Sequence, residues 1–401
     1  MQVKSKKKSW RYCLLVGAIQ LAVIVIGFLI FSAPPARQFA GDAGPISTER
    51  GVAYEPYRVR EVPWAIHVLR IDRTRTDLEL MTTMGGGSTL GLSGLTGQLR
   101  SIPSDWGRPV AAINGDFYRR EGESYAGDPR GLQILGGELV SGPIERACFW
   151  VDAKGVPRTG EVSREFAVTW PDGSQTPFGL NEEREGNMAV LYSSAVGSST
   201  GTSGGTEYVL ERVSDSPWLP LAPGRQYQAR IRQVRGGGNT PLKPDILVLS
   251  ISGISRFFSS RAAVGDMLKI STATSPDLRG VKTAIGGGPV LVRDGQARPG
   301  RVSRSMERHP RSAIGWNQKE FLFVEVDGRQ YGWSMGMTLP ELAEYMAKLG
   351  CQEAVGLDGG GSAELWFNGR IVNRPCDGHE RRMANTLILV EKQKPEKPEK
   401  P

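Results

Sequence analysis

Acidic, hydroxyl and basic residues gather around three consecutive glycines near the C-terminus of the chain. The first polar segment reads Asp358, Gly359, Gly360, Gly361, Ser362, Ala363 and Glu364. The second polar segment carries Asn373, Arg374, Glu380 and Arg381. Glycines have no Cβ, so a ligand can approach their main chain closely. Taken alone, the first segment also fits a glycine-rich turn whose aspartate caps local N–H groups.

Three further segments place polar residues or glycines where an apolar run begins or ends. Asn114 and Asp116 follow the run 110–113, and Arg311 directly precedes the run 312–316. The third segment is an apolar run interrupted by Gly286, Gly287 and Gly288. The spacing favours strands with polar side chains or open backbone at their ends.

The elements that must position these residues are mostly short apolar runs separated by turn residues. Strands are predicted at 64–71, 110–113, 209–213, 246–251, 321–326, 354–357 and 386–390. The strand 354–357 leads directly to Asp358. The Asn368-Gly369 pair predicts a type I′ hairpin within 362–373.

One helix is well specified by the sequence. Thr338 and Glu341 form a capping-box pair, Pro340 sits in the first turn, and Gly350 is placed to end the helix.

Charge and hydropathy separate the ends of the chain from its body. Of the net charge of +8, residues 1–12 carry five positive charges and the tail 392–401 a net two, which leaves about +1 between them. This balance argues against a nucleic-acid-binding surface. The uncharged run 13–31 predicts a transmembrane signal-anchor, because about 20 apolar residues cross a bilayer as a helix. A cleaved signal peptide is the alternative.

The basic segment 1–12 predicts a cytoplasmic N-terminus and an exported body, as in a single-pass membrane protein. A linker is expected at 32–55, a β-rich insertion at about 155–245, and a disordered tail at 392–401.

The cysteines after the apolar run are odd in number. At most one disulfide can form among Cys148, Cys351 and Cys376, and the last two, which flank the glycine turn, are the favoured pair. Their spacing does not suggest a zinc site.

Taken in order, these motifs resemble those of the phosphodiester glycosidase family over about residues 60–391. The resemblance implies a mixed α/β or α+β fold, with one large domain at 56–391. It also implies a hydrolase that releases a sugar from a phosphodiester. The expected substrate is a phosphorylated glycan of the cell envelope or outside the cell, with α-N-acetylglucosamine or a related sugar.

The residue types suit attack at the anomeric carbon, which expels a phosphate monoester and needs a carboxylate and anion-binding groups. The candidate catalytic carboxylates are Asp358, which ranks first, Glu364, Asp116 and Glu380. The candidate phosphate-binding groups are Arg311, Arg374, Arg381 and backbone N–H groups of Gly286, Gly287, Gly288, Gly359, Gly360 and Gly361. Asn114 and Asn373 are candidates for contact with the sugar, and Ser362 is a candidate for binding the substrate or its phosphate. No cofactor is required, although Asp116 could help to hold Ca²⁺ or Mg²⁺.

Two other functions fit the same residues. A metal-dependent phosphodiesterase would cleave at phosphorus, but such enzymes often use several histidines and this chain has three. A non-catalytic envelope protein that binds polysaccharide is the second.

Overall fold

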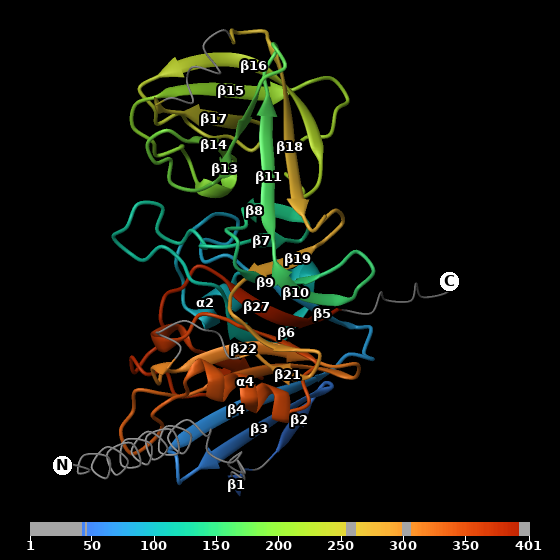
Figure 1. The fold of residues 1–401 in the computed structure, drawn as a ribbon, viewed down its shortest axis with the longest axis vertical. Coiled ribbons are helices and arrows are strands. Elements are labelled where there is room, and N and C mark those ends of the chain that lie inside the picture. The colour runs from blue at the N-terminus through green and yellow to red at the C-terminus, as the bar shows by residue number, and fades with distance from the viewer. Residues whose placement is uncertain (1–41, 45, 254–261, 299–305, 393–401) are drawn as a thin grey trace, which may run out of the picture. The chain divides into compact units, whose positions relative to one another are not determined.

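Four sheets of almost entirely antiparallel strands make up most of the part of the chain that the structure describes (Figure 1). A computed structural model describes residues 42–44, 46–253, 262–298 and 306–392. All of the described residues belong to one compact unit, and residues 1–41 lie outside the described residues.

The nine-stranded sheet carries several of the polar motifs at its strand ends. Its strands are β1 (Asp42–Ala43), β2 (Ser47–Glu49), β3 (Val52–Val59), β4 (Trp64–Asp72), β20 (Val290–Arg293), β21 (Gln296–Ala297), β22 (Arg311–Trp316), β23 (Glu320–Val326) and β24 (Glu353–Gly356). The order is β1-β3-β4-β23-β22-β24-β20-β21, with β2 beside β3. Strands β4 and β23 are buried almost throughout, so both faces of the sheet are covered there.

Two five-stranded sheets bring the remaining polar motifs next to it. The β6 sheet contains β5 (Leu78–Thr82), β6 (Arg108–Asn114), β25 (Leu365–Phe367), β26 (Arg370–Ile371) and β27 (Thr386–Glu391). The β19 sheet contains β7 (Gln133–Leu135), β8 (Glu138–Ser141), β9 (Ala147–Val151), β10 (Pro157–Glu161) and β19 (Thr283–Gly286). Phe149, Ile113, Ile285 and Phe323 share one buried cluster, so these two sheets and the nine-stranded sheet enclose a common core.

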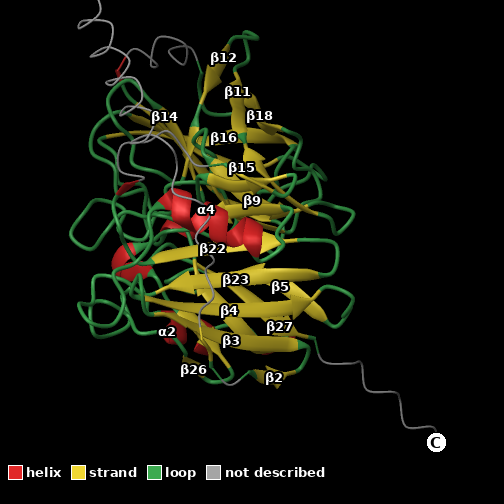
Figure 2. Ribbon diagram, turned by 60° about the horizontal axis from the view of Figure 1, so that its bottom comes forward, coloured by secondary structure: helices red, strands yellow, loops and turns green. Residues whose placement is uncertain are grey.

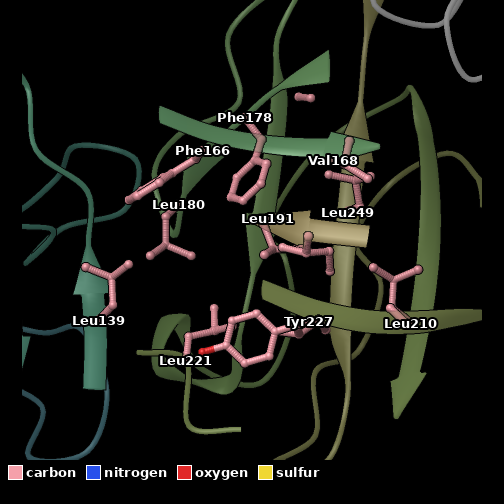
Figure 3. Close-up of a cluster of buried hydrophobic side chains, with 14 of the residues drawn as sticks. Leu139, Phe166, Val168, Phe178, Leu180, Leu191, Leu210, Leu221, Tyr227 and Leu249 are labelled. Atoms are coloured by element: carbon pink, nitrogen blue, oxygen red, sulfur yellow. The ribbon is translucent and has the colours of Figure 1, made fainter. Parts of the chain in front are cut away.

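An eight-stranded sheet occupies the region where a β-rich insertion was expected, and it is seen in green and yellow in Figure 1. Its strands are β11 (Ser163–Thr169), β12 (Gln175–Pro177), β13 (Gly179–Leu180), β14 (Ala189–Tyr192), β15 (Thr206–Arg212), β16 (Gln226–Gly236), β17 (Leu247–Ile251) and β18 (Met267–Ser275). The sheet therefore continues about 30 residues beyond the predicted limit of 245. Buried and exposed residues alternate along β16 and β18, as expected for strands with one wet face. The dry face packs Phe166, Leu191, Tyr227 and Leu249 (Figure 3).

Helices are few among the described residues, which corrects the mixed α/β prediction (Figure 2). The α-helices are α2 (Leu95–Arg100) and α4 (Leu339–Lys348), with 3₁₀ turns η1 (Ser104–Trp106), η2 (Ser194–Val196) and η5 (Gly360–Ser362). Neighbouring strands are antiparallel except β13 and β14, so short turns can join them where parallel strands would need helical crossovers. The fold is therefore β-rich.

Several local predictions are confirmed. The capping box of Thr338 and Glu341 is present at the start of α4. A strand is found at each of the predicted places, with bounds that differ from the expected ones by up to three residues. Asn368 and Gly369 both have positive φ between β25 and β26, as a type I′ turn requires.

Three other predictions need correction. The segment 32–55 is not simply a linker, because β2 and the first half of β3 lie within it. Cys148, Cys351 and Cys376 are free thiols, so the predicted disulfide is wrong. Cys351 is buried with its sulfur facing Gly315 of β22, whereas Cys376 is partly exposed.

The membrane location is also corrected. No helix among the described residues is long and apolar enough to cross a membrane. The predicted span 13–31 and its basic flank lie outside the described residues, as does the predicted tail from residue 393 onward.

Candidate active site

Direct backbone hydrogen bonds tie the glycine turn to the other motifs. The Asp358 N–H donates to the Gly115 carbonyl at 2.9 Å, and the Leu357 N–H donates to Ser312 O at 2.8 Å. The Gly288 N–H donates to the Gly356 carbonyl at 2.8 Å. Motifs that lie far apart in the sequence therefore meet around the end of β24.

Asp358 lies on the wall shared by two adjoining cavities. The larger cavity has a volume of about 1090 Å³ and the smaller about 490 Å³. Residues common to both linings are Phe117, Arg120, Arg146, Asp358 and Arg381. The shared wall thus combines one carboxylate with three guanidinium groups and an aromatic ring.

The backbone around Asp358 is held on both sides. Asn114 Nδ2 donates to the Asp358 carbonyl at 2.8 Å, and the Gly359 N–H donates to Asp358 Oδ1 at 2.9 Å. Burial raises the pKa of Asp358 to about 6, although the nearby Ser362 hydroxyl, the Gly359 N–H and the charge of Arg381 oppose the rise. The carboxylate is therefore mostly ionised at neutral pH and can act as a base or nucleophile.

Asp116 lies behind this wall and does not line either cavity. Its side chain is fully buried, and its Oδ1 lies 3.9 Å from Arg146 Nη2. Burial raises the pKa of Asp116 to about 7, against the opposing positive charge of Arg146. Arg146 in turn stacks over the Phe117 ring at 4.5 Å, so Asp116 and Phe117 together fix a guanidinium group in the cavity wall.

Arg311 and Arg329 form the basic end of the larger cavity. Arg311 Nε donates to Met337 O at 2.9 Å and its Nη2 donates to Glu307 O at 2.8 Å, so carbonyl groups fix its plane. Burial and the neighbouring charge of Arg329 lower the pKa of Arg311 to about 10. Among the described residues, no carboxylate lies within ion-pair distance of either guanidinium group. The Glu307 carboxylate acts on Arg311 only through its charge, and two adjacent cations without a carboxylate in ion-pair contact suit an anionic ligand.

Two predicted carboxylates have structural contacts outside the cavities. Glu364 is fully buried, burial raises its pKa to about 8, and its Oε1 accepts the Arg381 N–H at 2.6 Å. Glu380 accepts hydrogen bonds from the N–H and the hydroxyl of Thr96, at 2.9 and 2.5 Å, and so caps the first turn of α2. Neither residue lines either cavity.

The predicted sugar-contacting amides also organise the backbone. Asn114 Oδ1 accepts the Glu364 N–H at 3.2 Å. Asn373 accepts the Leu365 N–H at 2.8 Å and donates to Ala363 O at 3.1 Å. Both are buried, as is Ser362, but Ser362 also lines the smaller cavity. The Arg374 side chain lies over the Trp333 ring at 5.7 Å and lines neither cavity.

The glycines of the two triplets mainly make room for neighbouring atoms. Several of their N–H groups already donate hydrogen bonds within the protein and are not free to bind an anion. The N–H groups of Gly287, Gly288 and Gly360 donate to carbonyl oxygens, and that of Gly359 donates to Asp358. A Cβ at Gly361 would stand 1.9 Å from Arg381 Nη2, so this glycine makes room for the guanidinium group. Arg381 is also held by Asp377, with Nη2 2.6 Å from Oδ2.

The sequence argument missed several cavity-lining residues. Arg120 and Phe117 lie within or just after the segment that carries Asn114 and Asp116, so proximity to that motif was an available signal. Arg146 and Arg329 follow no recognisable motif. Only the folding of β9 and of the loop after β23 brings them to the site.

Three residues that could hold a metal ion lie apart from both cavities. They are His67, Glu325 and Asp327. The structure establishes no cofactor, and this cluster does not include Asp116.

Comparison with known proteins agrees with the arrangement of these motifs. Residues 255–390 match the model of the phosphodiester glycosidase family. The matched segment includes both glycine triplets (286–288 and 359–361), Arg311, Asp358 and Arg381. It begins after β17, so of the eight-stranded sheet it contains only β18.

Three similar proteins extend the comparison. The SPbeta prophage-derived uncharacterized protein YomE of Bacillus subtilis (strain 168) is 32% identical over 115 residues, which is 28% of this chain and 18% of that protein. A hypothetical protein from Synechocystis aligns with a TM-score of 0.69 and 21% identity, over 87% of this chain and 64% of that chain. A Burkholderia pseudomallei K96243 protein aligns with a TM-score of 0.63 and 23% identity, over 82% of this chain and 74% of that chain.

The sequence alignment and the structural alignments support different conclusions. The two structural alignments, both below 25% identity, support the fold. This chain spans less than two thirds of the length of YomE and of the Synechocystis chain.

Proposed function

We propose that the chain hydrolyses the bond between the anomeric carbon of a sugar and the oxygen of a phosphodiester. The observation that carries the proposal is the larger cavity, which joins the Asp358 carboxylate to the Arg311 and Arg329 guanidinium groups. A sugar phosphodiester presents an electrophilic carbon next to an anionic phosphate, and this cavity offers a complementary group for each.

We assign the binding of the substrate's phosphate to Arg311 and Arg329. Arg311 is fixed by the two carbonyl groups it binds, so its remaining N–H groups are already oriented when a ligand arrives. Arg329 Nε donates to His309 Nδ1 at 3.3 Å, and His309 Nε2 lies 2.9 Å from Glu307 Oε2. An anion between the two guanidinium groups would relieve the repulsion between them.

We assign the reaction at the anomeric carbon to the Asp358 carboxylate. In its ionised form the carboxylate can attack the anomeric carbon or activate a water molecule, and in both cases it stabilises an oxocarbenium-like transition state. The C–O bond breaks with its electron pair left on the phosphate oxygen. Water supplies the new hydroxyl group on the sugar. A phosphate monoester is a weak base, so its departure needs little help from a general acid.

The remaining candidate carboxylates receive other roles. Asp116 acts through Arg146 as a positioning residue, while Glu364 and Glu380 support the backbone. The family resemblance makes α-linked N-acetylglucosamine the first sugar to test, and Arg120, Arg130 and Arg146 give the smaller cavity a basic lining that suits an anionic acceptor.

The test is hydrolysis in ¹⁸O-labelled water by the full-length chain, with a panel of glycosyl-1-phosphodiesters that differ in their sugar. The proposal requires turnover of at least one substrate, with the label in the released sugar. Label in the phosphate would mean cleavage at phosphorus and would refute the assignment of Asp358. Binding of such compounds without turnover would indicate a binding protein instead.

A further inference from the structure

Three side chains of types that bind metal ions lie close together on one face of the nine-stranded sheet. His67 of β4 and Glu325 of β23 are direct cross-strand partners, so their side chains share a face of the sheet. Asp327 follows Glu325 by two residues and points to the same face. One ligand atom from each residue lies within 4.8 Å of the others.

The His67 ring is oriented as a metal-binding imidazole requires. Its Nδ1 lies 2.7 Å from the Tyr54 hydroxyl, and that hydroxyl donates to the Val372 carbonyl at 3.3 Å. Its Nε2 lies 3.3 Å from Asp327 Oδ2 and so faces the two carboxylates. A metal ion at this position would take the place of the proton on Nε2, and a second contact such as the one between Nδ1 and Tyr54 is usual for histidine ligands.

Glu325 lacks the partners that a buried carboxylate needs. The residue is 0% exposed, and neither carboxylate oxygen has a hydrogen bond of ordinary geometry. Among the described residues, no Lys or Arg lies within 4.0 Å of it, and the one basic group within that distance of Asp327 is His67. A buried carboxylate of this kind is stabilised by a cation or by a proton.

Asp327 is already held in place by several donors. Trp333 Nε1 donates to its Oδ2 at 2.7 Å, and the Arg374 N–H donates to its Oδ1 at 2.9 Å. Metal-binding carboxylates are commonly held by such outer hydrogen bonds.

We propose that His67, Glu325 and Asp327 bind one divalent metal ion with a structural role. Two carboxylates and a neutral imidazole supply a charge of −2, which one divalent ion balances. The imidazole favours Zn²⁺ or Mn²⁺ over Mg²⁺ or Ca²⁺, which prefer oxygen ligands. Ligand atoms on opposite sides of an ion with bonds of about 2.0–2.4 Å are roughly 4–5 Å apart, which matches the cluster.

The position of the cluster indicates what the ion would stabilise. It would fasten the end of β23 to the segment that contains Trp333 and to the backbone of Arg374. The loop between Asp327 and Trp333 carries Arg329 into the larger cavity. The ion would therefore position a phosphate-binding residue while lying outside the cavity itself.

The test measures metal content and thermal stability of the full-length chain. The purified protein is stripped with a chelator, dialysed against Zn²⁺, Mn²⁺, Ca²⁺ or Mg²⁺ singly, and analysed by elemental mass spectrometry. We expect about one ion of Zn²⁺ or Mn²⁺ per chain and a lower melting temperature after stripping. In Glu325→Gln, which keeps the shape of the side chain, affinity should fall at least about tenfold.

Asp128→Asn is the matched control, because Asp128 is a buried carboxylate with an unpartnered Oδ1 outside this cluster. This variant should keep the metal stoichiometry of the wild type. The proposal is wrong if the wild type rebinds none of the four ions, or if Glu325→Gln binds them equally well. If neither variant folds, the metal content of the wild type alone decides. These readouts are independent of hydrolysis, so the proposed function can fail while this site stands.

Discussion

The Asp116 carboxylate lies directly against the Cα of Gly286. A Cβ at position 286 would stand 2.3 Å from Asp116 Oδ2 and 3.0 Å from Gly131 Cα. A Cβ at Gly131 would stand 2.8 Å from the same oxygen. The two glycines therefore leave the space that this buried carboxylate occupies, and one of them belongs to the triplet at the end of β19.

Gly286→Ala should destabilise the protein, because a methyl group cannot be added without displacing Asp116. Such overpacking typically costs about 1–3 kcal/mol. Urea denaturation of the wild type, both single variants and Gly286→Ala/Asp116→Ala measures the coupling. The double variant should lose less free energy of unfolding than the sum of the singles. Gly186→Ala, where a Cβ meets nothing within 4 Å, is the control. Additive losses would show that the two residues do not compete for space.

Asp358→Asn should lower the rate of sugar release by at least about a thousandfold, since the amide can serve neither as a nucleophile nor as a base. The Gly359 N–H can still donate to the amide oxygen, so the melting temperature should change little. Glu380→Gln is the opposite case, with activity retained and stability reduced by about 1 kcal/mol through a weaker cap on α2. Sugar release and thermal unfolding are measured on both variants. An active Asp358→Asn enzyme would remove this residue from its proposed role.

Arg311→Ala and Arg329→Ala should each reduce kcat/KM for a sugar phosphodiester by about 10- to 100-fold, because each loses a charge-assisted hydrogen bond worth about 1.5–3 kcal/mol. An aryl glycoside of the same sugar has no phosphate and should be affected far less. Arg308→Ala is the matched control, since Arg308 pairs with Glu341 and lines neither cavity. Steady-state kinetics with both substrates separates the cases. Equal losses on the two substrates would contradict phosphate recognition.

The free energy of unfolding of Asp116→Asn, measured against that of the wild type, should be higher at pH 8 than at pH 5. The pKa of Asp116 is raised to about 7 in the folded state from an ordinary 3.8, so the folded protein binds this proton more tightly than the unfolded chain. The resulting stability is fully present below pH about 4 and is lost as the pH rises through about 7. The difference in pKa corresponds to at most about 4 kcal/mol.

Calorimetry at the two pH values measures this effect. Asp72→Asn provides the contrast, because hydrogen bonds from the side chain and backbone of Thr74 lower the pKa of Asp72. Its contribution to stability changes only below pH about 4, so this variant should show no difference between pH 5 and pH 8. The same change in stability at both pH values for Asp116→Asn would mean that Asp116 does not titrate in this range.

The sequence predicted individual strands well and their assembly poorly. Apolar runs and turn residues located β4, β6, β23 and β27, and the capping box located α4. Local signals of this kind depend on neighbouring residues. The fold class depends on which surfaces cover the sheets. Here other sheets cover faces that helices cover in an α/β fold, and short sequence patterns do not carry that information.

The same limit applies to the site. Asp358, Arg311 and Arg381 were predicted from motifs, and all three line the larger cavity. Glu380 resembled a catalytic acid in sequence, but its partner Thr96 lies 284 residues away and could not be foreseen. Arg329 has no local signature, because its position depends on the loop after β23. Contacts of high sequence separation decide which polar residues face the cavity.

Tyr125 connects the eight-stranded sheet to the loop that carries Arg120, Glu123 and Arg130 to the smaller cavity. Its hydroxyl donates to Thr200 O and lies 3.1 Å from the Tyr192 hydroxyl, and the two rings stack with centroids 6.1 Å apart. Tyr125 also has a φ of +58°, a conformation that a bulky residue rarely adopts unless its surroundings hold it there.

Tyr125→Ala should therefore raise KM several-fold while leaving kcat within about twofold, because the loop binds the substrate but does not carry Asp358. Tyr125→Phe keeps the stacked ring and should produce a smaller rise in KM. Tyr331→Ala, at a side chain that is 99% exposed, should leave both constants unchanged. Steady-state kinetics on the three variants measures the split. If Tyr125→Ala lowered kcat and left KM unchanged, the insertion would act on the reacting groups and not on the binding loop.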